Sequence, residues 1–103
     1  MENSDAFRRK FGQIITELAN VGDFLMEHGF YERAVEVFLT LSEGDPTFEA
    51  GSYAYDLGTC YEHMKEYSKA KEYFEIASRE NPHMPEYKEA AIRYQSIAPV
   101  REK

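Results

Sequence analysis

Residues 57–82, LGTCYEHMKEYSKAKEYFEIASRENP, carry the pattern that decides the fold. Gly58 lies three positions before Tyr61, and Ala70 and Phe74 follow at a spacing that brings both to one side of a helix. Pro82 closes the stretch, because proline cannot continue a helix. The stretch therefore predicts two helices separated by a break near residues 63–66, with a stop at Pro82.

The same pattern occurs earlier in the chain at a constant offset of 36 residues. Residues 15–48 overlay residues 51–84, and an internal repeat of this kind indicates a repetitive architecture. The matched pairs are Gly22 with Gly58, Tyr31 with Tyr67, Ala34 with Ala70, Phe38 with Phe74, and Pro46 with Pro82. The first copy breaks at residues 28–31, where Gly29 can take the left-handed conformation that ends a helix. Each copy is therefore expected to form a pair of helices.

The repeated residues have a structural explanation that requires no chemistry. Glycine and alanine allow antiparallel helices to approach to about 8–10 Å. Phenylalanine fills the space between successive pairs at the density of a protein interior. The scaffold residues of this kind are Gly22, Gly58, Ala34, Ala70, Phe38 and Phe74.

A further helix is expected over residues 84–97, after the second copy. Pro85 falls in its first turn, where the missing N–H is harmless. Its apolar stripe is formed by Tyr87, Ala91, Tyr94 and Ile97. Because no partner helix follows, this helix is expected to cap the exposed end of the second pair.

The first helix is expected to be unusually long, from about Asp5 to His28. One apolar stripe continues along it through Phe7, Phe11, Ile14, Leu18, Val21 and Leu25. We expect Phe7 and Phe11 to be buried by something beyond the repeats, most simply a second copy of the chain, since aromatic side chains are costly to leave in an exposed patch. The alternative is a segment that folds back at Gly12.

Composition bounds the domain count and the class of partner. The 103 residues suit a single domain over residues 1–103. A formal net charge of -7, from 19 acidic and 12 basic residues, argues against nucleic acid and anionic membranes as partners. Cys60 is the only cysteine, which excludes an intramolecular disulfide. No apolar run is long enough to span a bilayer, and the polar first residues lack a secretory signal, so a cytoplasmic location is expected.

The sequence contains no convincing catalytic or metal-binding constellation. Cys60 and His63 have a spacing compatible with a metal, with His28 and His83 as further ligands, but zinc sites need several such residues in paired spacings. The six glycines are scattered and form no phosphate-binding loop. We therefore expect no enzyme activity, no metal and no cofactor.

The pattern Leu57-Gly58-x-x-Tyr61, followed by Ala70, Phe74, Ala77 and Pro82, resembles the tetratricopeptide repeat family. The resemblance implies an all-α fold: a right-handed α-α superhelical stack of two helix pairs, with an extended N-terminal helix and a C-terminal capping helix. It also implies a concave groove, lined by the first helix of each pair, that holds a peptide or helix of a partner protein. The first copy matches the pattern more loosely.

Carried over to this sequence, the groove has a mainly acidic wall. The candidate residues are Thr16, Ala19, Asp23, Glu27, Ser52, Tyr55, Asp56, Thr59 and Glu62, with Glu89 and Arg93 added by the capping helix. Carboxylates favour a ligand that carries Lys or Arg. Repeats of this family that hold the carboxylate tails of heat-shock chaperones have Lys and Asn where this chain has Ala19, Asp23 and Asp56, which argues against that ligand.

These observations favour a non-enzymatic protein-interaction module, an adapter or chaperone-like scaffold that binds a basic or amphipathic segment of another protein. The alternative is a self-assembling structural subunit of a homo-oligomer, because a two-pair stack has exposed ends and a long apolar first helix.

Overall fold

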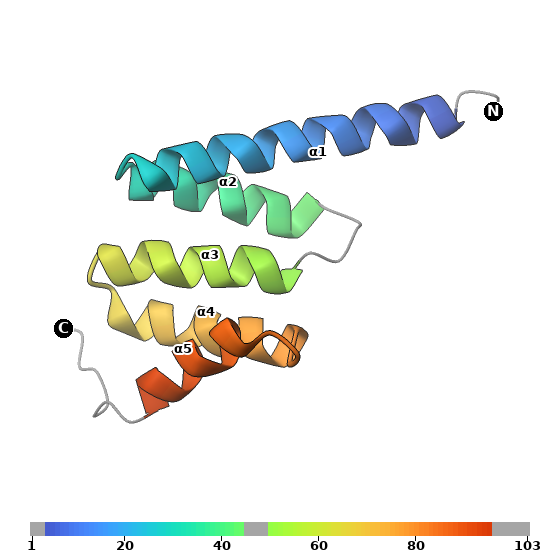
Figure 1. Cartoon of the computed structure of the whole chain (residues 1–103). Helices are drawn as coiled ribbons and strands as arrows, with labels where there is room; N and C mark the ends of the chain where they lie inside the picture. Colours follow the sequence, from blue (N-terminus) through green and yellow to red (C-terminus); the bar gives the residue numbers. More distant parts are fainter. Residues whose placement is uncertain (1–3, 45–49, 96–103) are drawn as a thin grey trace.

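A computed structural model shows how the helices are arranged, and it describes residues 4–44 and 50–95 (Figure 1). The regular structure within these ranges is helical throughout. Its helices are α1 (Ser4–Glu27), α2 (Tyr31–Gly44), α3 (Ala50–His63), α4 (Tyr67–Glu80) and α5 (Pro85–Gln95). The expectation of an all-α fold is confirmed for these described residues.

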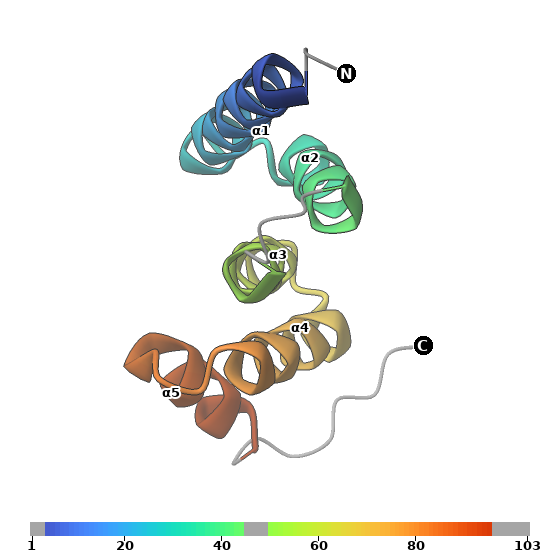
Figure 2. The same ribbon diagram turned by 90° about the vertical axis from the view of Figure 1, so that its right-hand side faces the viewer.

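Each helix packs against the next one along the chain, from α1 to α5. Viewed along the helices, α1, α3 and α5 lie on one side of the stack, and α2 and α4 lie on the other (Figure 2). α1 has 24 residues against 14 in each of α2, α3 and α4, and its N-terminal part extends past the end of α2 (Figure 1). The chain therefore presents one face built from alternate helices.

The turn inside each helix pair has the same backbone geometry. Gly29 has a φ of 83°, and Lys65, 36 residues later, has a φ of 64°. In the first turn the N–H of Phe30 donates to the carbonyl oxygen of Leu25 at 2.8 Å. In the second, the N–H of Glu66 donates to the carbonyl oxygen of Tyr61 at 2.9 Å. These six-residue closures are the Schellman ending of a helix, and the second forms without a glycine.

The core consists of the repeated residues and the aromatic residues beside them. Ala34, Ala70 and Ala77 are fully buried, and Phe38 and Phe74 are each 1% exposed. One buried cluster runs from α2 to α5 and includes Tyr94, whose ring centroid lies 5.5 Å from that of Phe74. Burial of Tyr87, Ala91 and Tyr94 confirms the apolar stripe of α5.

The expectation of a long first helix, from about Asp5 to His28, is confirmed by α1. The alternative, a segment that folds back at Gly12, is wrong, because the helix continues without interruption through Gly12. Val21 does not pack inside the chain but is 46% exposed, because α2 covers a different side of α1. Phe7 is 68% exposed, while Phe11 is half-buried and stacks against Phe7 with ring centroids 6.1 Å apart.

Pro46, Ile97 and the end of the expected last helix lie outside the described residues. Within the described ranges, no helix combines the length and apolarity that a bilayer crossing requires.

Candidate partner-binding face

The sequence-predicted groove residues belong to α1, α3 and α5, the helices on one side of the stack, and we call this side the α1/α3/α5 face (Figure 2). α1 contributes Thr16, Ala19, Asp23 and Glu27; α3 contributes Ser52, Tyr55, Asp56, Thr59 and Glu62; α5 contributes Glu89 and Arg93. Spacings of three and four residues bring the members on each helix to one side. These helices carry residues that are up to 77 positions apart in the sequence, from Thr16 to Arg93.

Asp23 on α1 and Asp56 on α3 interact electrostatically. Burial, followed by the charge of Asp23, raises the pKa of Asp56 to about 7 from an ordinary value of 3.8. Burial and then the charge of Glu27 also raise the pKa of Asp23. In residues 4–44 and 50–95, neither aspartate has a cationic partner. The face therefore carries acidic groups whose charge the chain itself does not neutralise.

Glu62 and Arg93 form an ion pair between α3 and α5. The Nη2 of Arg93 donates to the Oε2 of Glu62 at 2.9 Å. The guanidinium also lies 5.8 Å from the ring centroid of Phe74 and 5.4 Å from that of Tyr94. This part of the face is internally neutralised, in contrast to the part around Asp23 and Asp56.

Other predicted groove residues are partly used by the fold. Tyr55 is half-buried, with its ring centroid 4.8 Å from that of Tyr87 and 5.5 Å from that of Phe74. The Thr59 hydroxyl donates to the carbonyl oxygen of Tyr55 at 3.0 Å. Ala19 packs against the core. These residues shape the face more than they offer groups to a ligand.

Cys60 and His63, considered as metal ligands from their spacing, lie in different environments. Cys60 is fully buried, and burial followed by the charge of Asp56 raises the pKa of its thiol to about 12. His63 is exposed and stacks on Tyr31, with ring centroids 4.6 Å apart. Metal binding requires a thiolate, which this environment disfavours. The described residues contain no group of three or more candidate ligands.

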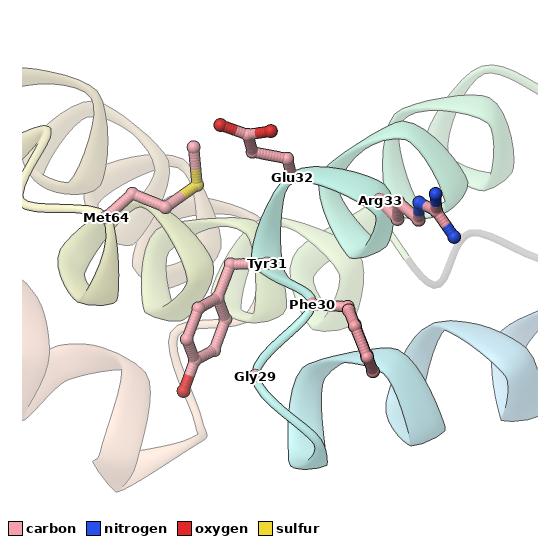
Figure 3. Close-up of a pocket in the computed structure, with 6 residues that line it drawn as sticks. All are labelled: Gly29, Phe30, Tyr31, Glu32, Arg33 and Met64. Atoms are coloured by element: carbon pink, nitrogen blue, oxygen red, sulfur yellow. The ribbon is translucent and has the colours of Figure 1, made fainter.

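An open hollow of about 330 Å³ lies away from the predicted face, beside the turns of the two helix pairs (Figure 3). It is lined by Gly29, Phe30, Tyr31, Glu32, Arg33 and Met64. The charged side chains that line it, Glu32 and Arg33, point in different directions in Figure 3, so charged groups do not converge on one point. The sequence patterns did not single out this hollow, and its side chains form no catalytic arrangement.

Comparison of the chain with protein-family models, with curated proteins and with solved structures returned no match. The tetratricopeptide resemblance therefore rests on the residues of this chain alone.

Proposed function

We propose that this chain is a tetratricopeptide-like stack that binds a basic segment of another protein on the α1/α3/α5 face. The repeated contacts support such a stack, because Gly22 with Phe38 and Gly58 with Phe74 are the same contact 36 residues apart. The alternation of α1, α3 and α5 with α2 and α4 is the layout that a helical-pair repeat requires (Figure 2).

The observation that carries the proposed function is the electrostatic interaction of Asp23 with Asp56, on the first helices of successive pairs, where the described residues place no cationic partner for either carboxylate. Burial, and then the charge of Asp23, disfavour ionisation of Asp56 and raise its pKa. A lysine or arginine placed between them would relieve this repulsion and gain charge-assisted hydrogen bonds. Binding of a cationic side chain is thus the chemistry for which the pair is best suited.

Selection of random peptides on the immobilised chain tests this function. We expect the retained peptides to be enriched in Lys and Arg. The double variant Asp23→Lys with Asp56→Lys should bind them about tenfold or more weakly, a difference of about 1.4 kcal/mol. Binding should also weaken as salt is raised, because the contacts are electrostatic.

The matched control is Glu36→Lys with Glu72→Lys. These exposed residues are also 36 positions apart, but they lie on α2 and α4, and their replacement changes the net charge by the same amount. Peptide affinity should stay within about twofold of the unmodified chain. Equal loss of binding in both double variants would show that peptide binding depends only on the net charge of the chain. Undiminished binding to the aspartate variant would show that the peptides bind elsewhere on the chain.

A second candidate function is self-assembly, which the exposed apolar side chains of α1 favour. Phe7, Ile14, Val21 and Phe24 are all 46% or more exposed.

A further inference from the structure

The side of α1 that faces away from the rest of the chain carries a row of exposed apolar side chains. We call this row the outer stripe; it consists of Phe7, Ile14, Val21 and Phe24, exposed by 68%, 52%, 46% and 55%. Spacings of seven, seven and three residues place them along one side of a helix. No element in residues 4–44 and 50–95 covers the stripe.

The internal repeat shows what this side of a helix does elsewhere in the chain. The positions 36 residues after Val21 and Phe24 are Leu57 and Cys60 of α3, which are 1% and 0% exposed. Both belong to the buried cluster that also holds Phe38 of α2. The Val21–Phe24 part of the outer stripe is therefore the counterpart of a packing surface, with valine in place of Leu57 and phenylalanine in place of Cys60.

The stripe is about as large as the largest apolar patch that single chains usually expose, and such patches are often functional. A buried phenylalanine accounts for about 150–250 Å², so four large side chains that are half exposed offer on the order of 400 Å² of apolar surface. Single-chain proteins rarely leave a larger patch in water. Two such stripes with their flanking polar groups approach the roughly 1,200 Å² at the lower end of stable interfaces.

Charges beside the stripe complement each other when two copies of α1 run antiparallel. Lys10 and Glu17 are exposed and lie four residues before and three residues after Ile14. With Ile14 on a two-fold axis, Phe7 of one copy meets Val21 of the other, and Lys10 meets Glu17. A parallel pair would instead place Lys10 beside Lys10 and Glu17 beside Glu17.

From this arrangement we propose that the outer stripe binds a second copy of this chain, forming an antiparallel α1 pair centred on Ile14. A surface that meets itself across a two-fold axis closes after two copies. The proposal specifies the self-assembly candidate, and it is independent of peptide binding on the α1/α3/α5 face. Failure of the peptide selection would not affect the proposed dimer, and absence of the dimer would not affect the proposed peptide binding.

Light scattering after size-exclusion chromatography measures the mass directly. The unmodified chain should have the mass of two 12.0 kDa chains at about 100 μM. Ile14→Asp should reduce the mass to that of one chain while circular dichroism stays unchanged, because the side chain is exposed within a single copy. Ile92→Asp is the matched control, since Ile92 on α5 is 50% exposed and lies outside the stripe, and it should remain dimeric.

Charge reversal tests the antiparallel orientation. Lys10→Glu and Glu17→Lys should each weaken the dimer about tenfold, and the double reversal should restore it. A single-chain mass for the unmodified protein would overturn the proposal and leave the stripe to another partner. A dimer that survives both Ile14→Asp and Val21→Asp, or one that Ile92→Asp breaks, would place the interface elsewhere. Failure of the double reversal to restore the dimer would overturn the antiparallel pairing.

Discussion

The ring of Phe74 on α4 lies directly against the backbone of Gly58 on α3, so that a methyl group at Gly58 would stand 2.7 Å from two ring carbons. Gly22 and Phe38 repeat the relationship in the first pair, at 2.8 Å. Carbon atoms in contact are normally about 3.5–4.0 Å apart, so neither site has room for a side chain. Each glycine sets the distance between the two helices of its pair.

Gly58→Ala should lower the free energy of unfolding by about 1–3 kcal/mol, because the added methyl group overpacks the contact with Phe74. Gly12→Ala is the control, since a Cβ there meets no atom within 4 Å. Alanine favours the helix over glycine by up to about 1 kcal/mol, so this control should gain stability. Urea denaturation measures both, and stabilisation by Gly58→Ala would show that α3 and α4 can separate freely.

Lys65→Gly should raise the free energy of unfolding by about 1 kcal/mol, because Lys65 has a φ of 64°, which favours glycine over a residue with a Cβ. Lys65→Ala keeps the Cβ and should show no comparable gain. Gly29→Ala, at the equivalent turn, should lose about 1 kcal/mol. Guanidinium denaturation of the three variants compares these effects, and a loss of stability in Lys65→Gly would contradict the left-handed turn.

The stability of the chain should fall as the pH rises from about 4 to 7. The pKa of Asp56 is raised to about 7 in the folded chain from 3.8, so within this window the folded state holds a proton that the unfolded state has released. The favourable contribution is complete below the unfolded pKa and is lost as the pH passes the folded one.

Asp56→Asn should remove most of this pH dependence and stabilise the chain at pH 8, because asparagine carries no charge that burial disfavours. The gain should be only about 1–2 kcal/mol, since water reaches part of the carboxyl group. Asp23→Asn should lower the pKa of Asp56, because the charge of Asp23 contributes to raising it. NMR titration of the carboxyl carbons follows both effects. An unchanged pKa of Asp56 in Asp23→Asn would show that the charge of Asp23 does not affect Asp56.

Arg93→Ala should loosen α5 and lower the free energy of unfolding by about 1 kcal/mol, through loss of the Glu62 ion pair and the cation–π contacts with Phe74 and Tyr94. Lys88→Ala, at another exposed position of α5, should have little effect. Hydrogen exchange should show faster exchange in α5 of Arg93→Ala than in α2. Equal protection of α5 in both variants would mean that apolar packing alone holds the helix.

Much of the helical layout was predictable because its signals are local. Gly29 ends α1 through its own backbone freedom, and Pro85 begins α5 where a proline is tolerated. The left-handed conformation of Lys65 could not be predicted from the residue itself, since lysine has no preference for it. Only the internal repeat indicates this conformation, because the position 36 residues after Gly29 must make the same turn.

The residues of the candidate face were predictable from the sequence, but their charge partners were not. The resemblance named Glu62, Arg93, Asp23 and Asp56 together, yet only the packed structure separates the neutralised pair from the two aspartates without a cation. Helix spacing also placed Val21 in one apolar stripe with Leu18 and Leu25. Its exposure could have been suspected by asking which helix would lie opposite it, given that its counterpart Leu57 lies next to α2.

The sequence by itself determined that the chain is helical, where its helices break, and that small residues recur opposite Phe38 and Phe74. These features follow from backbone preferences and from a period that neighbouring residues display. Only the tertiary structure decided the ionisation of Asp56, the partner of Arg93 and the exposure of the outer stripe. Burial and charge interactions depend on groups that are distant in the chain and adjacent in space, so they arise only when one helix lies against another.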